Sequence, residues 1–112
     1  MRRVLVCDDS PVARAAVEKK LRDRGVDVVS CGSAAEAHEV ELEGVRCALL
    51  DVDLGDGCGT DVAERLRSSA PELPIAFFTS EEAVGSDVGP VFRKPADLDA
   101  AIAWIDLCVR DD

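Results

Sequence analysis

The chain has 112 residues, of which 47% are hydrophobic and 32% are charged. These values are typical of a soluble globular protein and exclude disordered and fibrous classes. The net charge of −10, without a run of basic residues, disfavours direct binding to nucleic acid or to an anionic membrane. The length predicts one domain, residues 1–112.

The short apolar segments and the cysteine pattern narrow the class further. The N-terminal Met1-Arg2-Arg3 runs directly into a short apolar stretch, so we expect no signal peptide, no membrane span and a cytoplasmic location. No C-x-x-C pair occurs and the single histidine is His38, which argues against zinc and disulfide frameworks. We expect reduced thiols, mostly in the core, with Cys58 more exposed because it lies in a glycine-rich loop.

The first strand and helix are expected within residues 3–25. Arg3–Cys7 has the apolar, β-branched character of a buried strand. Pro11 then opens a helix whose N-cap is Ser10 or Asp9, and Gly25 ends it. The expected apolar side of this helix comprises Ala13, Ala16, Val17, the stem of Lys20 and Leu21.

A second strand and helix precede a central strand. Asp27–Cys31 is the strand, and Ser33 caps a helix that is expected to continue to about Glu43, with a weak apolar face. Gly44 stops this helix. Residues 47–51 are expected to form the third strand, with an apolar run typical of a strand buried on both faces of a parallel sheet.

The second half of the chain continues the alternation. A third helix is expected at 61–69, followed by strands at Ile75–Thr79 and Val91–Arg93. Residues 81–89 have room for about one or two helical turns. The last helix begins near Asp97, with an apolar face made of Leu98, Ala101, Ile102, Ile105 and Val109. Strands regularly separated by helices predict βαβ units, a parallel sheet and an α/β fold.

Polar residues follow four of the expected strands: Asp8-Asp9, Asp51, Thr79-Ser80 and Lys94-Pro95. Parallel sheets bind ligands beyond the carboxyl ends of their strands, so these groups are expected to meet. Converging carboxylates repel one another unless a cation is present, and a hard divalent ion such as Mg²⁺ suits oxygen ligands. One carboxylate can then act as a nucleophile toward phosphorus, and a lysine and a hydroxyl can stabilise the phosphoryl oxygens.

With these residues the chain resembles, over essentially its whole length, the receiver domain of bacterial response regulators. The resemblance implies a doubly wound, five-stranded, flavodoxin-like (βα)5 fold with a shortened or irregular fourth helix. It implies that Asp51 accepts a phosphoryl group, that Thr79 hydrogen-bonds this group and that Lys94 pairs with it. It also implies no enzymatic activity beyond self-phosphorylation from phosphodonors and autodephosphorylation.

The same resemblance implies a magnesium site and partner proteins. We expect Mg²⁺ to bind through Asp9, Asp51 and the backbone carbonyl of Asp53, with Asp8 acting mainly through water. Gly57 fits the family's loop glycine, and the Lys94–Pro95 peptide bond is expected to be cis. The expected partners are a histidine kinase or phosphotransfer protein and a downstream protein target.

Two features depart from the family pattern. Receivers usually place Tyr or Phe three residues before the lysine as a rotamer switch, but this position holds Val91. Phe92 follows and is expected to face the opposite side of the strand. The segment between Thr79 and Lys94 is also shorter than is typical, by roughly two helical turns.

Two other functions share these residues. A pseudo-receiver would use the same fold for protein interaction without being phosphorylated. A phosphohydrolase of the haloacid dehalogenase type would use Asp51 as nucleophile and Asp53 as general acid, but that family places its motif after the first strand. Finally, Ala101, Trp104 and Cys108 form a second apolar strip on the last helix, which predicts either a homodimer surface or partial burial in the core.

Overall fold

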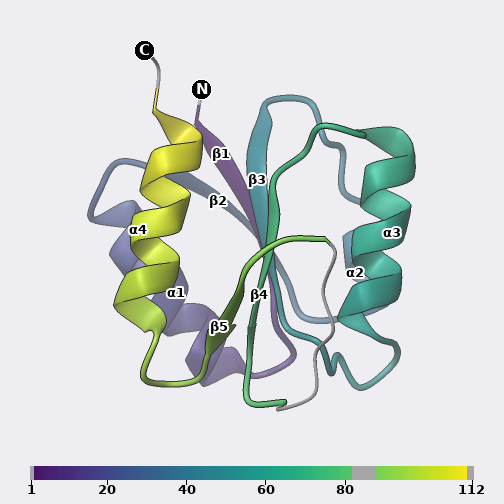
Figure 1. Ribbon diagram of the computed structural model, residues 1–112, viewed down its shortest axis with the longest axis horizontal. Coiled ribbons are helices and arrows are strands. Elements are labelled where there is room, and N and C mark those ends of the chain that lie inside the picture. The colour runs from purple at the N-terminus through teal and green to yellow at the C-terminus, as the bar shows by residue number, and fades with distance from the viewer. Residues whose placement is uncertain (1, 82–87, 111–112) are drawn as a thin grey trace.

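A computed structural model describes residues 2–81 and 88–110 and shows five strands and four helices within them (Figure 1). The strands are β1 (Arg3–Cys7), β2 (Asp27–Cys31), β3 (Val45–Leu50), β4 (Ile75–Thr79) and β5 (Val91–Arg93). The helices are α1 (Pro11–Arg22), α2 (Ala34–His38), α3 (Gly59–Ser69) and α4 (Leu98–Val109).

The five strands form one parallel sheet in the order β2-β1-β3-β4-β5, so the predicted α/β fold is confirmed. The strand order reverses next to β1, which is the flavodoxin-like arrangement. Cys7 lies opposite Leu50, and Thr79 lies opposite Arg93. This register brings the residues that follow these strands to the same edge of the sheet.

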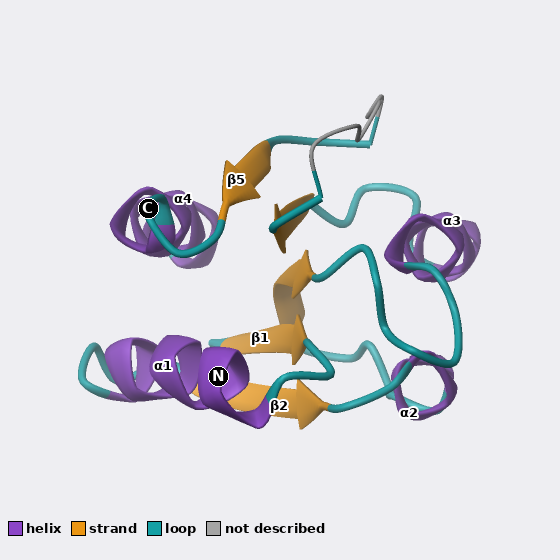
Figure 2. Cartoon of the chain, turned by 90° about the horizontal axis from the view of Figure 1, so that it is seen from below, coloured by secondary structure: helices purple, strands orange, loops and turns teal. Residues whose placement is uncertain are grey.

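Helices cover both faces of the sheet, with α1 and α4 on one side and α2 and α3 on the other (Figure 2). Alternating strand residues divide the core accordingly: Leu5 packs toward α2 and α3, and Val4 packs toward α1 and α4. On β5, Val91 packs against the first of these clusters and Phe92 against the second. The prediction that these two side chains face opposite sides is therefore confirmed.

The strand bounds agree with the sequence prediction except at β3, which starts at Val45 and ends at Leu50. The largest difference concerns α2, which ends at His38 instead of continuing to about Glu43. Val40 and Leu42 still pack against the core, but they do so from non-helical chain. The weak apolar face of this segment explains the difference, because a short helix needs tertiary packing to persist.

The helix starts follow the predicted caps. The Ser10 hydroxyl accepts a hydrogen bond from the Ala13 N–H at 3.3 Å, and the Ser33 hydroxyl accepts one from the Glu36 N–H at 3.1 Å. α1 ends at Arg22, before Gly25, whose φ of 75° lies in the left-handed region that favours glycine. α3 starts at Gly59, two residues earlier than predicted.

The structure corrects one predicted apolar surface and, for another, favours one of the two predicted roles. Ala16 of α1 is exposed, so it does not belong to the core face. On α4, Ala101 is fully buried, and the Trp104 ring lies 6.4 Å from the Phe92 ring between centroids. Trp104 and Cys108 are half-buried against the core, so the strip is largely part of that core, and a homodimer through α4 stays a prediction.

The predicted fourth helix falls mainly on residues 82–87, which lie outside the described residues. Within the described part of the chain, no helix is long and apolar enough to cross a membrane. All five cysteines are free, and Cys7, Cys31 and Cys47 are buried while Cys58 and Cys108 are half-buried. The expectation that most of the thiols lie in the core is therefore confirmed for Cys7, Cys31 and Cys47.

Candidate functional site

Three carboxylates meet at the carboxyl ends of β1 and β3. One oxygen from each of Asp8, Asp9 and Asp51 lies within 4.8 Å of the others. Asp8 and Asp51 are buried, at 3% and 8% exposure, whereas Asp9 is exposed. The parallel register of β1 and β3 explains this convergence, because Cys7 and Leu50 are paired and the acids follow directly after them.

Lys94 reaches this acidic cluster from the end of β5. Its Nζ lies 2.7 Å from Asp8 Oδ2 and 2.9 Å from Asp51 Oδ2, so one ammonium bridges two buried carboxylates. The Lys94 N–H also donates to the Thr79 carbonyl at 3.0 Å, and the Lys94–Pro95 peptide bond is cis as expected. The lysine is thus held at both its backbone and its side chain.

Burial and pairing act in opposite directions on these charges. Burial raises the pKa of Asp8, although the hydrogen bonds from Lys94 and from the Ser10 N–H act to lower it. Burial alone would lower the pKa of Lys94, but its hydrogen bonds to Asp8 and Asp51 raise that pKa overall. The pKa values of both Asp8 and Lys94 therefore lie above those of the free side chains.

Backbone contacts fix the two buried carboxylates. The Ser10 N–H donates to Asp8 Oδ1 at 2.9 Å, and the Val52 N–H donates to Asp51 Oδ1 at 2.7 Å. Arg14 on α1 donates from Nη1 to the Asp8 carbonyl at 2.7 Å. Sequence reasoning missed Arg14, because its position on the helix shows no link to the preceding loop until the two are folded together.

Thr79 and Asp53 occupy less central positions. Thr79 is fully buried at the end of β4, and its hydroxyl accepts a hydrogen bond from the Glu81 N–H at 3.1 Å. Asp53 is exposed, and its Oδ1 accepts from the Gly55 N–H at 3.0 Å. The structure therefore joins Asp8, Asp9, Asp51 and Lys94 directly, while Thr79 is linked to them through the backbone of Lys94.

The strictest glycine requirement in this region falls at Gly59, which sequence reasoning did not single out. A Cβ at Gly59 would lie 1.9 Å from the Asp51 carbonyl oxygen, a distance that no side chain can occupy. A Cβ at Gly57 would lie 3.0 Å from the Ala34 Cβ, which is tight but less severe. The signal that could have found Gly59 is its place directly after Cys58, where the loop turns into α3.

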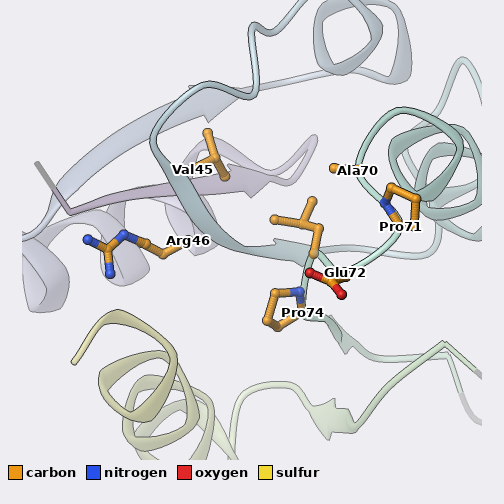
Figure 3. Close-up of a pocket in the computed structure, with 7 residues that line it drawn as sticks. Val45, Arg46, Ala70, Pro71, Glu72 and Pro74 are labelled. Atoms are coloured by element: carbon orange, nitrogen blue, oxygen red, sulfur yellow. The ribbon is translucent and has the colours of Figure 1, made fainter. Parts of the chain in front are cut away.

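A hollow that is separate from the acidic cluster lies beside the starts of β3 and β4. It has a volume of about 580 Å³ and is lined by Val45, Arg46, Ala70, Pro71, Glu72, Leu73 and Pro74 (Figure 3). Val45 and Arg46 start β3, and Pro74 directly precedes β4, so this hollow lies at the opposite edge of the sheet from the acids. Its lining offers one carboxylate, on Glu72, and no cluster of metal ligands.

Comparison with known proteins identifies the family. The sequence model of one protein family, the response regulator receiver domain, matches residues 4–97 of this chain. The chain belongs to this family. Its members are signalling modules and generally not enzymes, so the chain is a receiver domain of the two-component type.

Relatives of this receiver domain include longer regulators. It is 37% identical over 82 residues to the probable transcriptional regulatory protein TcrX of Mycobacterium tuberculosis (strain ATCC 25618 / H37Rv), a match that covers 72% of this chain and 35% of TcrX. It is 31% identical over 116 residues to the response regulator MprA of Mycobacterium leprae (strain TN), covering 96% of this chain and 51% of MprA. The receiver domain thus spans only part of these relatives.

Solved structures show the same fold. The non-phosphorylated HemR receiver domain of Leptospira biflexa superposes with a TM-score of 0.85 at 20% identity, covering 100% of this chain and 97% of that one. The response regulator protein TrrA of Thermotoga maritima, solved in complex with Mg²⁺-BeF, gives a TM-score of 0.85 at 22% identity, covering 96% of this chain and 99% of that one.

Proposed function

We propose that this receiver domain is a phosphoacceptor switch of a two-component phosphorelay, with Asp51 as the residue that takes the phosphoryl group. The observation that carries this proposal is the place of the Asp51 carboxylate. It lies at the end of the central strand, beside two further carboxylates and 2.9 Å from the Lys94 ammonium. No single one of these groups requires phosphoryl transfer, but together they supply a nucleophile, cation ligands and a positive charge.

The chemistry is a transfer between two covalent partners. A carboxylate oxygen of Asp51 attacks phosphorus while the bond from phosphorus to the donor breaks, which leaves an acyl phosphate on Asp51. The donor is a phosphohistidine of a kinase or phosphotransfer protein, or a small acyl phosphate. Lys94 moves its charge toward the phosphoryl oxygens, and the Thr79 hydroxyl donates a hydrogen bond to one of them.

The acidic cluster suits Mg²⁺, which favours carboxylate, carbonyl and water oxygens. We assign direct ligation to Asp9, Asp51 and the Asp53 carbonyl, with Asp8 acting mainly through water. Bound there, the ion would neutralise charge that develops on the phosphoryl oxygens. The structural neighbour TrrA, which was solved with Mg²⁺-BeF, supports this assignment by its fold.

Relatives also support the choice of partners. They include the sensor protein TorS of Escherichia coli (strain K12) and the autoinducer 1 sensor kinase/phosphatase LuxN of Vibrio harveyi, as well as transcriptional regulators. We therefore assign a histidine kinase or phosphotransfer protein as the donor and a downstream protein as the target. We propose a cytoplasmic location to match these partners.

Intact-mass measurement with acetyl phosphate and Mg²⁺ tests the proposal. The unaltered chain should gain one phosphoryl group, and the gain should disappear without Mg²⁺ or in Asp51→Asn. Asp61→Asn, which removes an exposed acid from the first turn of α3, is the matched control and should still be modified.

The same experiment separates the alternatives. A chain that binds Mg²⁺ but never gains mass would be a pseudo-receiver, for which Val91 at the usual aromatic position is the supporting feature. Continuous release of phosphate that is abolished by Asp53→Asn would indicate the phosphohydrolase. In a receiver, the same substitution should change only the lifetime of the acyl phosphate.

A further inference from the structure

The loop that connects β3 to α3 is attached to the N-terminus of α2 by one side chain. Asp56 Oδ1 accepts a hydrogen bond from the Ala34 N–H at 2.8 Å, and its Oδ2 accepts one from the Ala35 N–H at 3.1 Å. The first N–H groups of a helix have no partner within the helix, so they are available to a loop. These two bonds keep the pKa of Asp56 below its usual value, so the carboxylate stays ionised at neutral pH.

Asp56 is not needed as the ordinary cap of α2. That role belongs to Ser33, whose hydroxyl accepts from the Glu36 N–H. The helix is only five residues long and stands 22 residues away from Asp56 in the sequence. The contact is therefore a tertiary link between the β3–α3 loop and α2.

Backbone hydrogen bonds within the loop connect Asp56 to the neighbourhood of Asp53. The Asp56 N–H donates to the Leu54 carbonyl at 2.9 Å, and the Leu54 N–H donates to the Gly57 carbonyl at 3.1 Å. Gly57 itself lies against Ala34, because a Cβ there would be 3.0 Å from the Ala34 Cβ. The position of Asp56 thus fixes the backbone on both sides of it, including Leu54, the direct neighbour of Asp53.

A carbonyl ligand depends on the loop more than a side-chain ligand does. A carboxylate can adjust to an ion by rotating its side chain, whereas a backbone carbonyl moves only if the chain moves. The Asp53 side chain is exposed, and the backbone bonds on either side of it lie within the loop itself: the Gly59 N–H donates to the Val52 carbonyl at 2.6 Å and the Leu54 N–H to the Gly57 carbonyl at 3.1 Å. These bonds give the turn its shape, whereas the two bonds of Asp56 link it to another element, α2. The attachment to α2 would therefore help to set where the Asp53 carbonyl points relative to the acidic cluster.

We infer that Asp56 is a positioning residue for the divalent cation: it ties the β3–α3 loop to α2 and so presents the Asp53 carbonyl to the acidic cluster. This inference rests on the proposed function, because it assumes that the carbonyl is a ligand. Residues that orient metal ligands contribute to affinity without touching the metal, since they reduce the ordering that binding requires.

Calorimetric titration with MgCl₂ tests this role in single variants of the chain and in one double variant. Asp56→Ala should weaken Mg²⁺ binding by about tenfold, the lower end of the usual effect for such supporting groups. Asp56→Asn should weaken it less, because the amide keeps one acceptor oxygen. Asp56 and Asp61 line a common hollow beside the N-terminus of α2. Asp61→Asn removes an equal charge from this hollow without touching the Ala34 contact, so its Mg²⁺ affinity should remain close to that of the unaltered chain.

Ala34→Pro approaches the same contact from the helix. It removes the N–H that Asp56 Oδ1 accepts, at the first position of α2, where proline is tolerated after the extended Ser33. Because Asp56 Oδ2 can still accept from the Ala35 N–H, Ala34→Pro should weaken Mg²⁺ binding in the same direction as Asp56→Ala but by less. Asp56→Ala already removes both bonds, so the double variant should bind Mg²⁺ no more weakly than Asp56→Ala alone.

The outcomes are separable. If Asp56→Ala and Ala34→Pro lower only the urea stability of the metal-free chain and leave the Mg²⁺ dissociation constant unchanged, Asp56 serves α2 alone and the inference is wrong. Equal weakening in Asp56→Asn and Asp61→Asn would reduce the effect to charge and would also overturn it. Failure of the unaltered chain to bind Mg²⁺ would instead refute the proposed magnesium site itself.

Discussion

The two edges of the sheet differ in shape and in chemistry. The amino edge, where the strands begin, carries a hollow of about 580 Å³ whose lining is mainly apolar and includes one carboxylate, on Glu72, and one guanidinium, on Arg46. At the carboxyl edge, where the strands end, the Lys94 ammonium lies 2.7 Å from Asp8 and 2.9 Å from Asp51. In this fold the site is marked by which side chains converge, and the size of a hollow is a poor guide to it.

The difference follows from the parallel sheet. Every strand ends at the same edge, so the residues after β1, β3, β4 and β5 are brought together whatever their distance in sequence. At the amino edge lie the segments that lead from each helix to the start of the next strand, such as residues 70–74 before β4, and their prolines and apolar residues cover the end of the core. Substitutions at the two edges should therefore have unequal effects, which matched pairs of variants can test.

The largest effect is expected from Gly59→Ala at the carboxyl edge. Its Cβ would lie 1.9 Å from the Asp51 carbonyl oxygen, so the backbone at the phosphoacceptor must shift, and the free energy of unfolding should fall by about 3 kcal/mol. The matched variant at the amino edge is Gly44→Ala, just before β3, where an added Cβ would meet no atom within 4 Å. It should cost about 1 kcal/mol from its left-handed φ alone. Urea unfolding measures both, and equal losses would contradict this view of Gly59.

A smaller effect is expected from Lys94→Met. Removing the ammonium leaves two buried carboxylates without their shared partner, which should lower the free energy of unfolding by about 2 kcal/mol in metal-free buffer. Lys20→Met is the control, because its 3.2 Å ion pair with Asp99 is largely exposed and contributes well under about 1 kcal/mol. Added Mg²⁺ should reduce the loss in Lys94→Met. A loss that does not depend on Mg²⁺ would argue against a cation site.

Asp8→Asn should produce a pH-dependent gain in stability. Burial raises the pKa of Asp8 above 3.8, so between 3.8 and the folded value the folded chain binds more protons than the unfolded chain. The stability that protonated Asp8 contributes is therefore present below pH 3.8 and is lost as the pH rises through the folded pKa. The asparagine of the variant does not titrate, so the variant does not lose this stability. In metal-free urea unfolding, the free energy of unfolding of Asp8→Asn relative to the unaltered chain should therefore rise with pH, by about 1.4 kcal/mol per pH unit within that interval. A constant difference would contradict the raised pKa.

The smallest effect is expected at the amino edge. Glu72→Gln removes the only carboxylate that lines the large hollow. It should leave the rate of phosphorylation by acetyl phosphate within about twofold of the unaltered chain, because exposed substitutions away from a site rarely matter. A severalfold change in that rate would show that the two edges are coupled.

Sequence reasoning placed most of the fold because the local signals were strong. β1, β2, β4 and β5 have the predicted bounds, and Ser10 and Ser33 are the caps. The site residues could be proposed because each follows a strand, and a parallel sheet sends all of them to one edge. Asp8, Asp9, Asp51 and Lys94 were found together for this reason.

What sequence reasoning missed depends on contacts between distant segments. The close approach of Gly59 to Asp51, the bond from Arg14 to the Asp8 carbonyl and the link between Asp56 and α2 join residues that no periodic pattern connects. The predicted end of α2, near Glu43, was wrong for a similar reason, since the helix ends at His38. Val40 and Leu42 have apolar character that fits a helix, but they reach the core from irregular chain.

The double ion pair of Lys94 has a consequence for how the site fills. With its Nζ 2.7 Å from Asp8 and 2.9 Å from Asp51, this side chain acts as a resident counter-ion attached to β5. On the proposed function, loading magnesium is therefore an ion exchange in which a tethered monovalent charge gives way to a free divalent one. The tether keeps the local concentration of the monovalent competitor high and constant, so the affinity for magnesium reflects the difference between the two cations and not the full attraction of the carboxylates.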